Sequence, residues 1–529
     1  MTKRYAFLIG SLLFGATSFL QAQSGTLDPS FNGTGYVIDP VNNLDAGQKI
    51  LVQPDQKILL IGMSFDAQYV ARAQVYRYNP DGSRDTGFGI NGVFTYELDF
   101  EADLYSAVLT ADGKIILAGS TTDYQTYRLL LIQLNADGTL DDSFAGTGVL
   151  AQSVSVVVDN AEDMAYDLAL DADGNILVCG SSYDANYIRR PIVVRFTPDG
   201  QLDTGFGTNG VASIPAGVGS SGFRGIVVQA DGKILASGFF GAGLQWFELL
   251  LVRYEADGSL DASFGNAGVV QYNYGNVDDE GYDLALAPDG SILVAGVTVT
   301  QTYNYSALLM KFTADGAVDI SFGTDGAVEE DLNNFDLASN VSWISDGTII
   351  MAGSSGVGPP NGFDMAVWKY LPDGTRDNSF GTNGLAAPVI PDRYAMINAM
   401  EVQADGRILV GGQARTTVNV NNFLIARLQN DITNSVAELS SVDQAYTFPN
   451  PASAGSTVTV QLDNALQPIA RIELYAADGR RIHSYSVQQL ARTAQGVSIQ
   501  LPTDVAPGIY QLAFGQPGAR STSTIIIAQ

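Results

Sequence analysis

The side chains that most often carry catalysis are scarce in this chain. Its single histidine is His483, and its single cysteine is Cys179. Histidine titrates most readily near neutral pH, and Ser-His-Asp or Cys-His hydrolysis needs one beside the nucleophile. Cys179 lies in the apolar run "NILVCG", where we expect a buried thiol that behaves as a small hydrophobe. The residues before His483 therefore exclude histidine-based hydrolysis and leave carboxylates and tyrosines as candidates for chemistry.

Acids and aromatic rings gather in segments of variable length, such as "QYNYGNVDDEGY" and "TVTQTYNY". Aromatic faces beside carboxylates suit sugar rings, and carboxylate oxygens suit Ca²⁺. We predict no catalytic residue and no required cofactor, with Ca²⁺ as the one metal that these oxygens favour. The alternative is that the rings only cover strand edges. The predicted ligand-binding residues are Tyr124, Tyr183, Trp246, Tyr303, Tyr305, Asp278 and Asp279.

The charge of the chain narrows its partners. Aspartate and glutamate number 56 against 27 lysines and arginines, a formal net charge of −29 over 529 residues. Binding nucleic acid by neutralising phosphates needs the opposite sign, so we exclude nucleic acid as a partner.

The variable segments alternate with a motif that occurs seven times. A clear copy reads "GIVVQADGKILASG" and, after a variable stretch, "LLLVRYEADGSLDASFGNAGVV". A long, near-constant period indicates a repeat architecture. A phenylalanine stands at the same point of every copy. The first, partial copy has Phe31, and the others have Phe88, Phe144, Phe206, Phe264, Phe322 and Phe380.

Each repeat contains four short β-rich runs separated by turns. Asp-Gly pairs between the runs predict hairpins in which both turn residues take positive φ angles. Four antiparallel strands repeated radially describe a propeller blade, with an antiparallel solenoid as the alternative. The segment "SGTLDPSFNGTGYVI", which begins at Ser24, matches the end of a repeat. The last copy stops after its third strand. We therefore predict an all-β, seven-bladed propeller that the N-terminal strand closes, which removes two unpaired edges.

One acid also recurs in every copy, beginning with Asp28, and a basic residue recurs with it except in one copy, where Gln133 stands. We expect each acid to cap a turn or to pair with a base of its own blade, because every blade needs it. The alternative is a ring of ligands. The remaining members of the set are Asp85, Asp141, Asp203, Asp261, Asp319 and Asp377.

The two ends of the chain predict export. Residues 1–22 combine Lys3 and Arg4 with a short apolar run and a small-residue cleavage site, as in a signal peptide. No other stretch could span a bilayer as a helix, so we expect a mature chain without a transmembrane segment. Residues 433–445 form a polar connector. Residues 446–529 alternate short strands with Asn-Pro, Asp-Gly and Pro-Gly turns, which predicts a small Ig-like β-sandwich.

Two resemblances extend these expectations. The pieces "ADGKILASG" and "RYEADGSLDASFG" resemble the delta-60 repeat of exported bacterial proteins. That resemblance implies a propeller-like array over residues 23–432 and little chemistry. The pieces "FPNPAS", "IELYAADGRRI" and "LPTDVAPGIYQLAF" resemble the type IX secretion sorting domain of Bacteroidetes-like bacteria. That resemblance implies that the type IX machinery carries the chain across the outer membrane for release or surface attachment.

We therefore expect a secreted or cell-surface propeller that binds glycan or protein through its variable loop face. Variable loops on a rigid scaffold are the usual location of binding function. The alternatives are a histidine-free glycan hydrolase or lyase that uses carboxylates or tyrosines, and a purely structural envelope component.

Overall fold

The computed structural model describes residues 24–430 apart from short segments, and parts of residues 445–528. The predicted signal peptide, and all but the last residue of the predicted connector, lie outside the described residues. Among the described residues there is no helix of the length and apolarity that a membrane crossing requires. The segments of the first part that are not described are 40–43, 67, 97–100, 155–161, 216–218, 242–245, 275–276, 357–361, 392–393 and 416–419.

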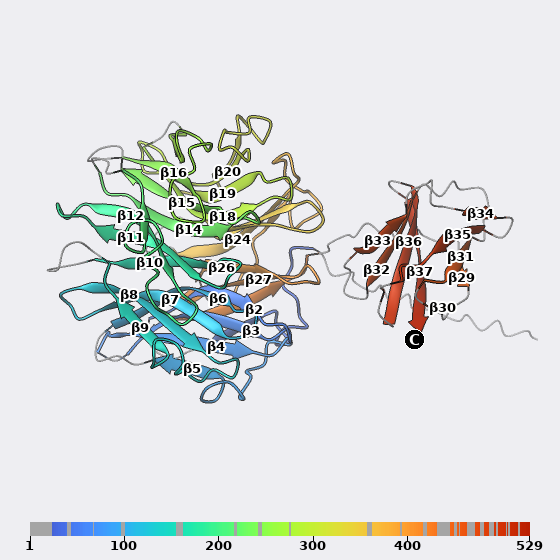
Figure 1. Ribbon diagram of the computed structural model, residues 1–529, viewed down its shortest axis with the longest axis horizontal. Helices are drawn as coiled ribbons and strands as arrows, with labels where there is room; N and C mark the ends of the chain where they lie inside the picture. Colours follow the sequence, from blue (N-terminus) through green and yellow to red (C-terminus); the bar gives the residue numbers. More distant parts are fainter. Residues whose placement is uncertain are drawn as a thin grey trace, which may run out of the picture.

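Residues 24–430 form seven four-stranded antiparallel blades arranged around an axis (Figure 1), and a parallel pairing of Tyr305 with Phe335 joins two neighbouring blades. The innermost strands are β2 (Asp45–Val52), β6 (Glu101–Leu109), β10 (Met164–Leu170), β14 (Gly222–Val228), β18 (Asp278–Leu286), β22 (Phe335–Trp343) and β26 (Tyr394–Val402). The second strands are β3 (Ile58–Phe65), β7 (Ile115–Thr122), β11 (Ile176–Tyr183), β15 (Ile234–Gly241), β19 (Ile292–Val299), β23 (Ile349–Gly356) and β27 (Ile408–Arg415).

The outer half of each blade follows the same order. The third strands are β4 (Ala71–Tyr78), β8 (Tyr127–Leu134), β12 (Arg189–Phe196), β16 (Phe247–Tyr254), β20 (Tyr305–Phe312), β24 (Phe363–Tyr370) and β28 (Asn421–Leu428). The outermost strands are β5 (Val93–Tyr96), β9 (Val149–Gln152), β13 (Val211–Ser213), β17 (Val269–Tyr272), β21 (Ala327–Glu330), β25 (Leu385–Ala386) and β1 (Tyr36–Asp39). The four predicted strands per repeat are confirmed.

The N-terminal strand closes the ring, as predicted. β1 pairs antiparallel with β28, with Tyr36 opposite Ala426 and Asp39 opposite Phe423. Leu27 adds a further bridge to Leu428. In Figure 1 the orange β26 and β27 accordingly lie beside the blue β2 and β3, and β2 contacts both of the orange strands. The last blade thus takes its outermost strand from the start of the chain.

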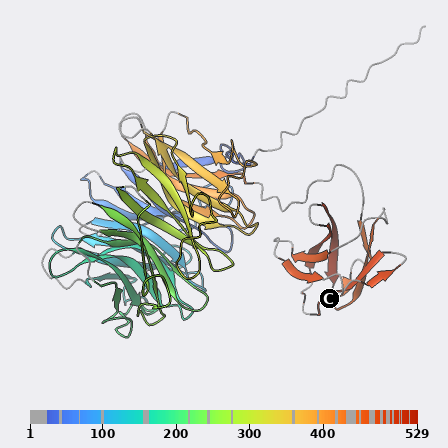
Figure 2. The same ribbon diagram turned by 90° about the horizontal axis from the view of Figure 1, so that it is seen from above.

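The core lies between neighbouring blades. One cluster, for example, joins Leu59 and Val75 of the first blade to Leu104 and Leu117 of the second. Because each sheet is covered on both faces, the second and third strands are buried over almost their full length and read as continuous apolar runs. Figure 2 shows the same sheets after a 90° turn about the horizontal axis.

The turns between first and second strands differ from the expected type. Only the glycine has a positive φ in most of them, for example Gly174 at 81°, while Asp173 does not. The N–H of Gly174 donates to the carbonyl oxygen of Asp171 at 3.1 Å, and the carboxylate of Asp171 accepts the N–H of Asp173 at 3.0 Å. In the first repeat Gln56 occupies the glycine position, with φ at 67°. The turn therefore needs one left-handed residue, which the glycine supplies at least cost.

The recurring acid and base connect the end of one blade to the next. Arg253 donates through Nε to Asp261 at 2.6 Å and through Nη1 to the carbonyl oxygen of Ala314, in the following blade, at 2.5 Å. The second oxygen of Asp261 accepts the N–H and the hydroxyl of Ser263 at 2.9 and 2.6 Å. The structure thus shows both contacts that we expected for this acid. In the copy with Gln133, Lys114 takes over and lies 2.6 Å from its acid, Asp141.

The recurring phenylalanine completes this connection. The guanidinium of Arg253 lies 4.4 Å from the centre of the Phe264 ring, and the ring is fully buried. The ring edge lies against the turn glycine of the next blade. A Cβ added to Gly138, for instance, would lie 2.7 Å from the ring of Phe88. We call the acid, the base, the phenylalanine and this glycine the blade staple.

The described strands after residue 444 form two further sheets. One has the order β29 (Ala445–Phe448), β31 (Thr457–Leu462), β35 (Gly496–Gln500), β34 (Ala491–Thr493). The other has the order β30 (Ala452–Ser453), β37 (Ala519–Ala528), β36 (Gly508–Gln516), β32 (Arg471–Ala476), β33 (Arg481–Tyr485). The β-rich character of this tail is confirmed, and its Ig-like sandwich architecture stays a prediction.

Candidate functional site

Two places in the propeller present side chains that could bind a ligand. The first is the loop face, where the second-to-third and fourth-to-first connections of every antiparallel blade emerge. The second is the axis of the ring, which the seven innermost strands surround. The predicted ligand-binding residues all lie in or beside the loop-face connections.

Five consecutive blades each present one exposed aromatic ring on the connection between the second and third strands. These side chains are 47% to 68% exposed, although aromatic rings are ordinarily buried. We call the set the aromatic crescent: Tyr69, Tyr124, Tyr187, Trp246 and Tyr303. Tyr124, Trp246 and Tyr303 were predicted from the sequence, whereas Tyr69 and Tyr187 were missed.

The four tyrosines of the aromatic crescent share an unusual backbone conformation. Their φ angles lie between 58° and 66°. Bulky residues avoid this left-handed region, and strain of this kind typically costs on the order of 1 kcal/mol or more. In three of the turns the tyrosine N–H donates to the carbonyl oxygen three residues earlier, at 2.9 Å: Tyr69 to Asp66, Tyr187 to Asp184 and Tyr303 to Thr300. That spacing of three is a signal that could have identified Tyr69 and Tyr187.

Ion pairs brace three of these connections. Arg72 lies 2.9 Å from Asp66, and the carboxylate of Asp66 also accepts the N–H groups of Gln68 and Val70. Arg190 contacts Asp184 at 2.7 Å in the third blade. In the second blade Arg128 contacts Asp123 at 2.8 Å. Three of the connections that carry the rings are therefore preformed turns.

Two of the predicted tyrosines lie at strand ends rather than at turn tips. Tyr183 is half-buried at the end of β11 and packs edge-on against Tyr187, with ring centres 6.1 Å apart. Tyr305 begins β20 and stacks on Phe335, with ring centres 4.9 Å apart. Both rings support the loop face from beneath.

The two predicted acids have structural contacts. Asp278 accepts the N–H of Phe247 at 2.8 Å. Asp279 is 0% exposed and accepts the Thr298 hydroxyl at 2.6 Å and the N–H of Tyr274 at 2.7 Å. Burial raises the pKa of Asp279 and these bonds partly oppose that rise. The Asp279 carboxylate is therefore closed to a ligand, contrary to the expectation that placed it on an open surface.

The contact of Asp279 recurs in other blades. Asp45 accepts the hydroxyl of Ser64, and Asp163 accepts that of Ser182, each at 2.6 Å and each across 19 residues. Asp279 and Thr298 have the same spacing. An acid at the start of an innermost strand thus fastens the neighbouring strand, which explains why Asp279 belongs to the scaffold.

The structure offers little for Ca²⁺. Within the described part of the chain, three or more His, Cys, Asp or Glu side chains are nowhere grouped to hold a metal ion. The sequence "DADGN" forms a hairpin turn in which Asp171 accepts the side-chain amide of Asn175 at 2.8 Å.

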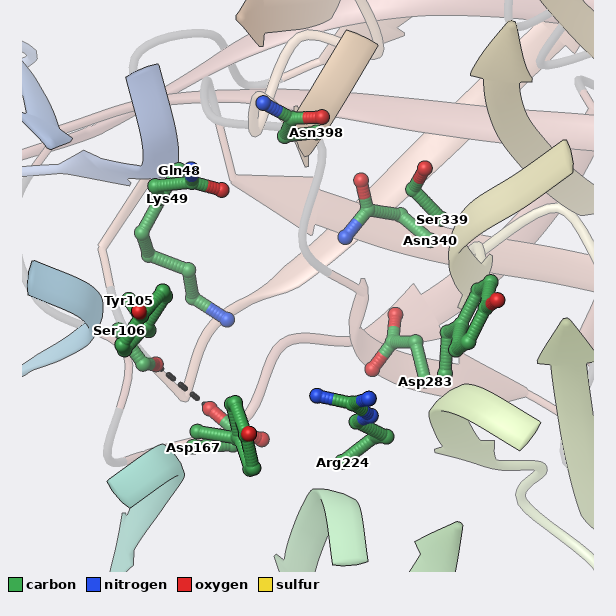
Figure 3. Close-up of a pocket in the computed structure, with 12 residues that line it drawn as sticks. Gln48, Lys49, Tyr105, Ser106, Asp167, Arg224, Asp283, Ser339, Asn340 and Asn398 are labelled. Atoms are coloured by element: carbon green, nitrogen blue, oxygen red, sulfur yellow. Dashed lines mark hydrogen bonds between the residues drawn. The ribbon is translucent and has the colours of Figure 1, made fainter. Parts of the chain in front are cut away.

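The axis of the ring contains a cavity of about 380 Å³ that sequence reasoning did not predict (Figure 3). Every innermost strand has a β-bulge at the same level, where the pairing register shifts. A bulge leaves one residue unpaired and re-aims its side chain. The residues at the bulges that line the cavity are Gln48, Lys49, Tyr105, Ser106, Tyr166, Asp167, Arg224, Tyr282, Asp283, Ser339, Asn340 and Asn398.

Two cations of the cavity differ from the other basic residues of the propeller. Within the described part of residues 24–430, Lys49 and Arg224 form no ion pair, whereas the other lysines and arginines, Arg415 aside, each form at least one. Arg224 stacks on Tyr166 at 4.2 Å from the ring centre, and its buried Nε has no hydrogen-bond partner. In Figure 3 the Lys49 ammonium points into the space between Asp167, Arg224 and Asp283.

The acids of the cavity are held by donors of neighbouring blades. Asp167 accepts the hydroxyl of Ser106 at 2.5 Å and the N–H of Ile226 at 3.1 Å. Asp283 accepts the N–H of Val341 at 2.9 Å. Burial raises the pKa of Asp283 to about 6, although Lys49 opposes that rise. Burial lowers the pKa of Lys49, but Asp167, Asp283 and Glu401 outweigh it, and the net shift is upward.

The sequence contained one signal for this cavity. A bulge interrupts the strict alternation of an innermost strand, so that polar or aromatic residues follow one another, as in Tyr166-Asp167 and Tyr282-Asp283. The two residues that could do thiol or imidazole chemistry lie elsewhere. Cys179 is buried in β11 as predicted, and burial raises its pKa well above the ordinary value. His483 lies in β33 with its ring centre 4.6 Å from that of Tyr485.

No curated protein matches the chain. Among solved structures, the chain is similar to a protein of unknown function from Dyadobacter fermentans, at 10% identity over 75% of this chain and 98% of that one, with a TM-score of 0.37. It is also similar to the propeller domain of the Trilobed protease from Pyrococcus furiosus, at 9% identity over 76% and 100% of the two chains, with a TM-score of 0.37.

A third similar structure is a polysaccharide lyase, an ulvan lyase bound to -[GlcA(1-4)Rha3S]-, at 9% identity over 75% and 96% of the two chains, with a TM-score of 0.42. Similarities at this level carry no argument about function. The family described as "Domain of unknown function (DUF5122) beta-propeller" matches residues 53–88, 110–144, 172–206, 229–264, 287–322, 344–380 and 403–431. The chain is thus a β-propeller that carries seven DUF5122 repeats.

Proposed function

We propose that this protein is an exported propeller that binds a polymeric glycan along the aromatic crescent. The observation that carries the proposal is the exposure of one aromatic ring per blade in five consecutive blades, with four tyrosines held at strained turn tips. Strain retained at an exposed position favours a functional reason for the residue. A flat ring offers a sugar both an apolar face and, in tyrosine, a hydroxyl group.

A glycan fits the crescent better than a folded protein does. Protein interfaces have a contiguous, desolvated centre. The crescent rings instead stand apart on separate blades and are flanked by ion-paired turns such as Asp66–Arg72 and Asp184–Arg190. Repeated, separate rings suit a ligand that is itself a repeating chain, because each contact is weak and several act together. Preformed turns reduce the ordering cost of binding.

The test measures binding of the full chain to a panel of neutral and acidic polysaccharides by affinity electrophoresis and calorimetry. Changing Trp246 or Tyr303 to Ala should weaken binding by roughly fivefold each, because a stacked ring contributes about 1 kcal/mol. Ile320→Ala is the matched control, since Ile320 is 76% exposed on the opposite end of the blades. Failure of every polysaccharide, with capture of proteins through the same rings, would replace the glycan by a protein ligand.

The same incubations distinguish binding from catalysis. Mass spectrometry of the polymers should show no new ends. Turnover that disappears on changing a single acid would favour the hydrolase or lyase alternative. An inert chain that binds neither polymer nor protein would leave the structural envelope component.

The export part of the proposal is supported by the leader and by the tail. Residues 1–22 resemble a signal peptide, the propeller copies resemble delta-60 repeats, and residues 446–529 resemble a type IX sorting domain. In a host with type IX secretion, removal of the tail should leave a folded propeller in the periplasm. Delivery of the truncated chain to the cell surface or the medium at the normal level would contradict this proposal.

A further inference from the structure

The axial cavity contains charges that face one another without contact. Lys49 and Arg224 form no ion pair within the described residues, yet Lys49 is under the electrostatic influence of Asp167, Asp283 and Glu401. Elsewhere in the propeller the basic side chains contact their acids directly, as Arg253 contacts Asp261 at 2.6 Å. The bulges thus hold cations and carboxylates around a common space that neither group fills.

The carboxylates keep free acceptor positions toward this space. Each described oxygen of Asp283 has one backbone donor, Leu284 N–H for one and Val341 N–H for the other, both at 2.9 Å. A carboxylate has about four lone-pair sites, so further donors can be accepted. Lys49 offers three N–H donors, and Arg224 five, of which the buried Nε–H is unused. The buried Oδ1 of Asn340 is also without a partner and adds an acceptor.

We propose that the axial cavity binds one neutral, polyhydroxylated saccharide unit, whose hydroxyl groups bridge Lys49 and Arg224 to Asp167 and Asp283. A hydroxyl group donates one hydrogen bond and accepts two, so the same hydroxyl can donate to a carboxylate and accept an N–H from a cation. The cavity volume of about 380 Å³ lies within the range of small-ligand sites. Tyr105 and Tyr166, with ring centres 5.5 Å apart, supply an aromatic wall for the faces of the sugar.

The charge balance favours a neutral ligand over an anion. The cavity and its surroundings hold more carboxylates than cations: Asp167, Asp283 and Glu401 act on Lys49, and Glu280 acts with Arg224. A carboxylate or sulfate group would be attracted by Lys49 and Arg224. It would also be repelled by the surrounding acids, and charge repulsion is strong at low dielectric. A neutral hydroxylated ring gains charge-assisted hydrogen bonds to both signs without that repulsion.

This site stands apart from the proposed glycan binding at the loop face. The cavity is lined by residues of the seven innermost strands and shares none with the aromatic crescent. The crescent would hold a polymer chain, whereas the cavity accommodates a single unit. Failure of one proposal therefore leaves the other intact.

The test titrates the full chain with D-glucose, D-galactose, D-mannose, L-rhamnose and cellobiose, and with D-glucuronate and sulfate as anionic arms. Calorimetry and saturation-transfer NMR report binding. Lys49→Met keeps the aliphatic stem and removes the ammonium, so it should weaken the neutral ligand at least tenfold. Lys57→Met is the matched control, because Lys57 pairs with Asp85 at 3.1 Å outside the cavity. Trp246→Ala serves as the control on the loop face.

The second variant, Asn340→Leu, keeps the approximate side-chain volume and guards against loss of fold in Lys49→Met. It should also weaken a neutral sugar, because it removes the unpartnered acceptor Oδ1 and the amide donors of Asn340. Folding of each variant is checked by circular dichroism. The inference is overturned if no neutral sugar binds the parent at 10-millimolar concentration, about the weak limit of specific sites. It is equally overturned if binding survives both cavity variants, if Trp246→Ala weakens it as much, or if only glucuronate or sulfate binds.

Discussion

The blade staple makes a quantitative prediction at Asp261. This carboxylate is 2% exposed and accepts bonds from Arg253 at 2.6 Å, Lys233 at 2.8 Å and Ser263 at 2.9 Å. Burial alone would raise the pKa of Asp261, but the bonds from Lys233, Ser263 and Arg253 outweigh it and hold the pKa well below its ordinary value. Asp261→Ala should therefore destabilise the propeller at neutral pH.

The magnitude follows from the partners that remain. A hydrogen bond to a charged group contributes about 1.5–3 kcal/mol, and contributions within one cluster are not additive. Arg253 keeps the carbonyl oxygen of Ala314, and Lys233 keeps Glu255 at 2.7 Å, so neither cation is stranded. We expect a loss of about 2–3 kcal/mol. The matched control is Asp257→Ala, because the carboxylate of the exposed Asp257 accepts its bonds from Ser259 of its own turn. Its loss should stay below about 1 kcal/mol.

The assay is equilibrium urea unfolding of parent and variants, followed by fluorescence and by circular dichroism. The pH dependence gives a second readout. Because the folded pKa of Asp261 is depressed, its stabilisation is present above the unfolded pKa of about 4 and is lost as pH falls below it. The stability gap between parent and Asp261→Ala should therefore narrow from pH 5 to pH 3. Equal losses for Asp261→Ala and Asp257→Ala, or a gap that does not change with pH, would refute this account of the staple.

Two further predictions concern the innermost strand β6 and the closure of the ring. Burial first, and then Glu101, raise the pKa of Asp103 to about 6, and its Oδ1 has no partner. The folded state therefore loses stability as pH rises from about 4 to 6. Asp103→Asn should be more stable than the parent by about 1–2 kcal/mol above pH 6 and should show no gain below pH 4. Thermal unfolding at each pH measures the difference. A gain at low pH only would contradict the sign. Deletion of residues 24–39 removes β1 and the partner of Arg427, Asp28, so the exposed edge of β28 should cause aggregation or a sharp fall in melting temperature in light scattering and calorimetry. A chain that begins at Ser24 is the control, and a monomeric, equally stable deletion variant would count against closure by β1.

The blades could be predicted from the sequence because their determinants are local and repeat. Apolar runs of strand length and the recurring acid and phenylalanine occur in each copy, whereas Gln56 replaces the turn glycine in one copy and Gln133 replaces the base in another. Each copy therefore specifies nearly the same unit. The closure could be predicted for a related reason, since the partial copies at the two ends complement each other. The turn type was predicted less well, because positive φ is needed at Gly174 alone and the residue type does not reveal which of two neighbours adopts it.

The aromatic crescent was predicted in part. Tyr124, Trp246 and Tyr303 stand in variable segments whose composition suggested exposure, and they are exposed. Asp279 stands in the same kind of segment but is buried, because it fastens Thr298 of the neighbouring strand. Composition alone does not say on which side of a strand end a carboxylate lies.

The periodicity of the sequence predicts the repeat, the four strands of each blade and the recurring acid, base and phenylalanine, because these depend on neighbours within a single copy. The contacts that these residues make with the next blade became visible only in the structure. The contents of the axis could be learned only from the folded ring. Lys49, Asp167, Arg224 and Asp283 come from four different blades, and each lies at the one-residue bulge of its innermost strand. Their meeting depends on the closure of all seven blades, and no local pattern in a single copy carries that information.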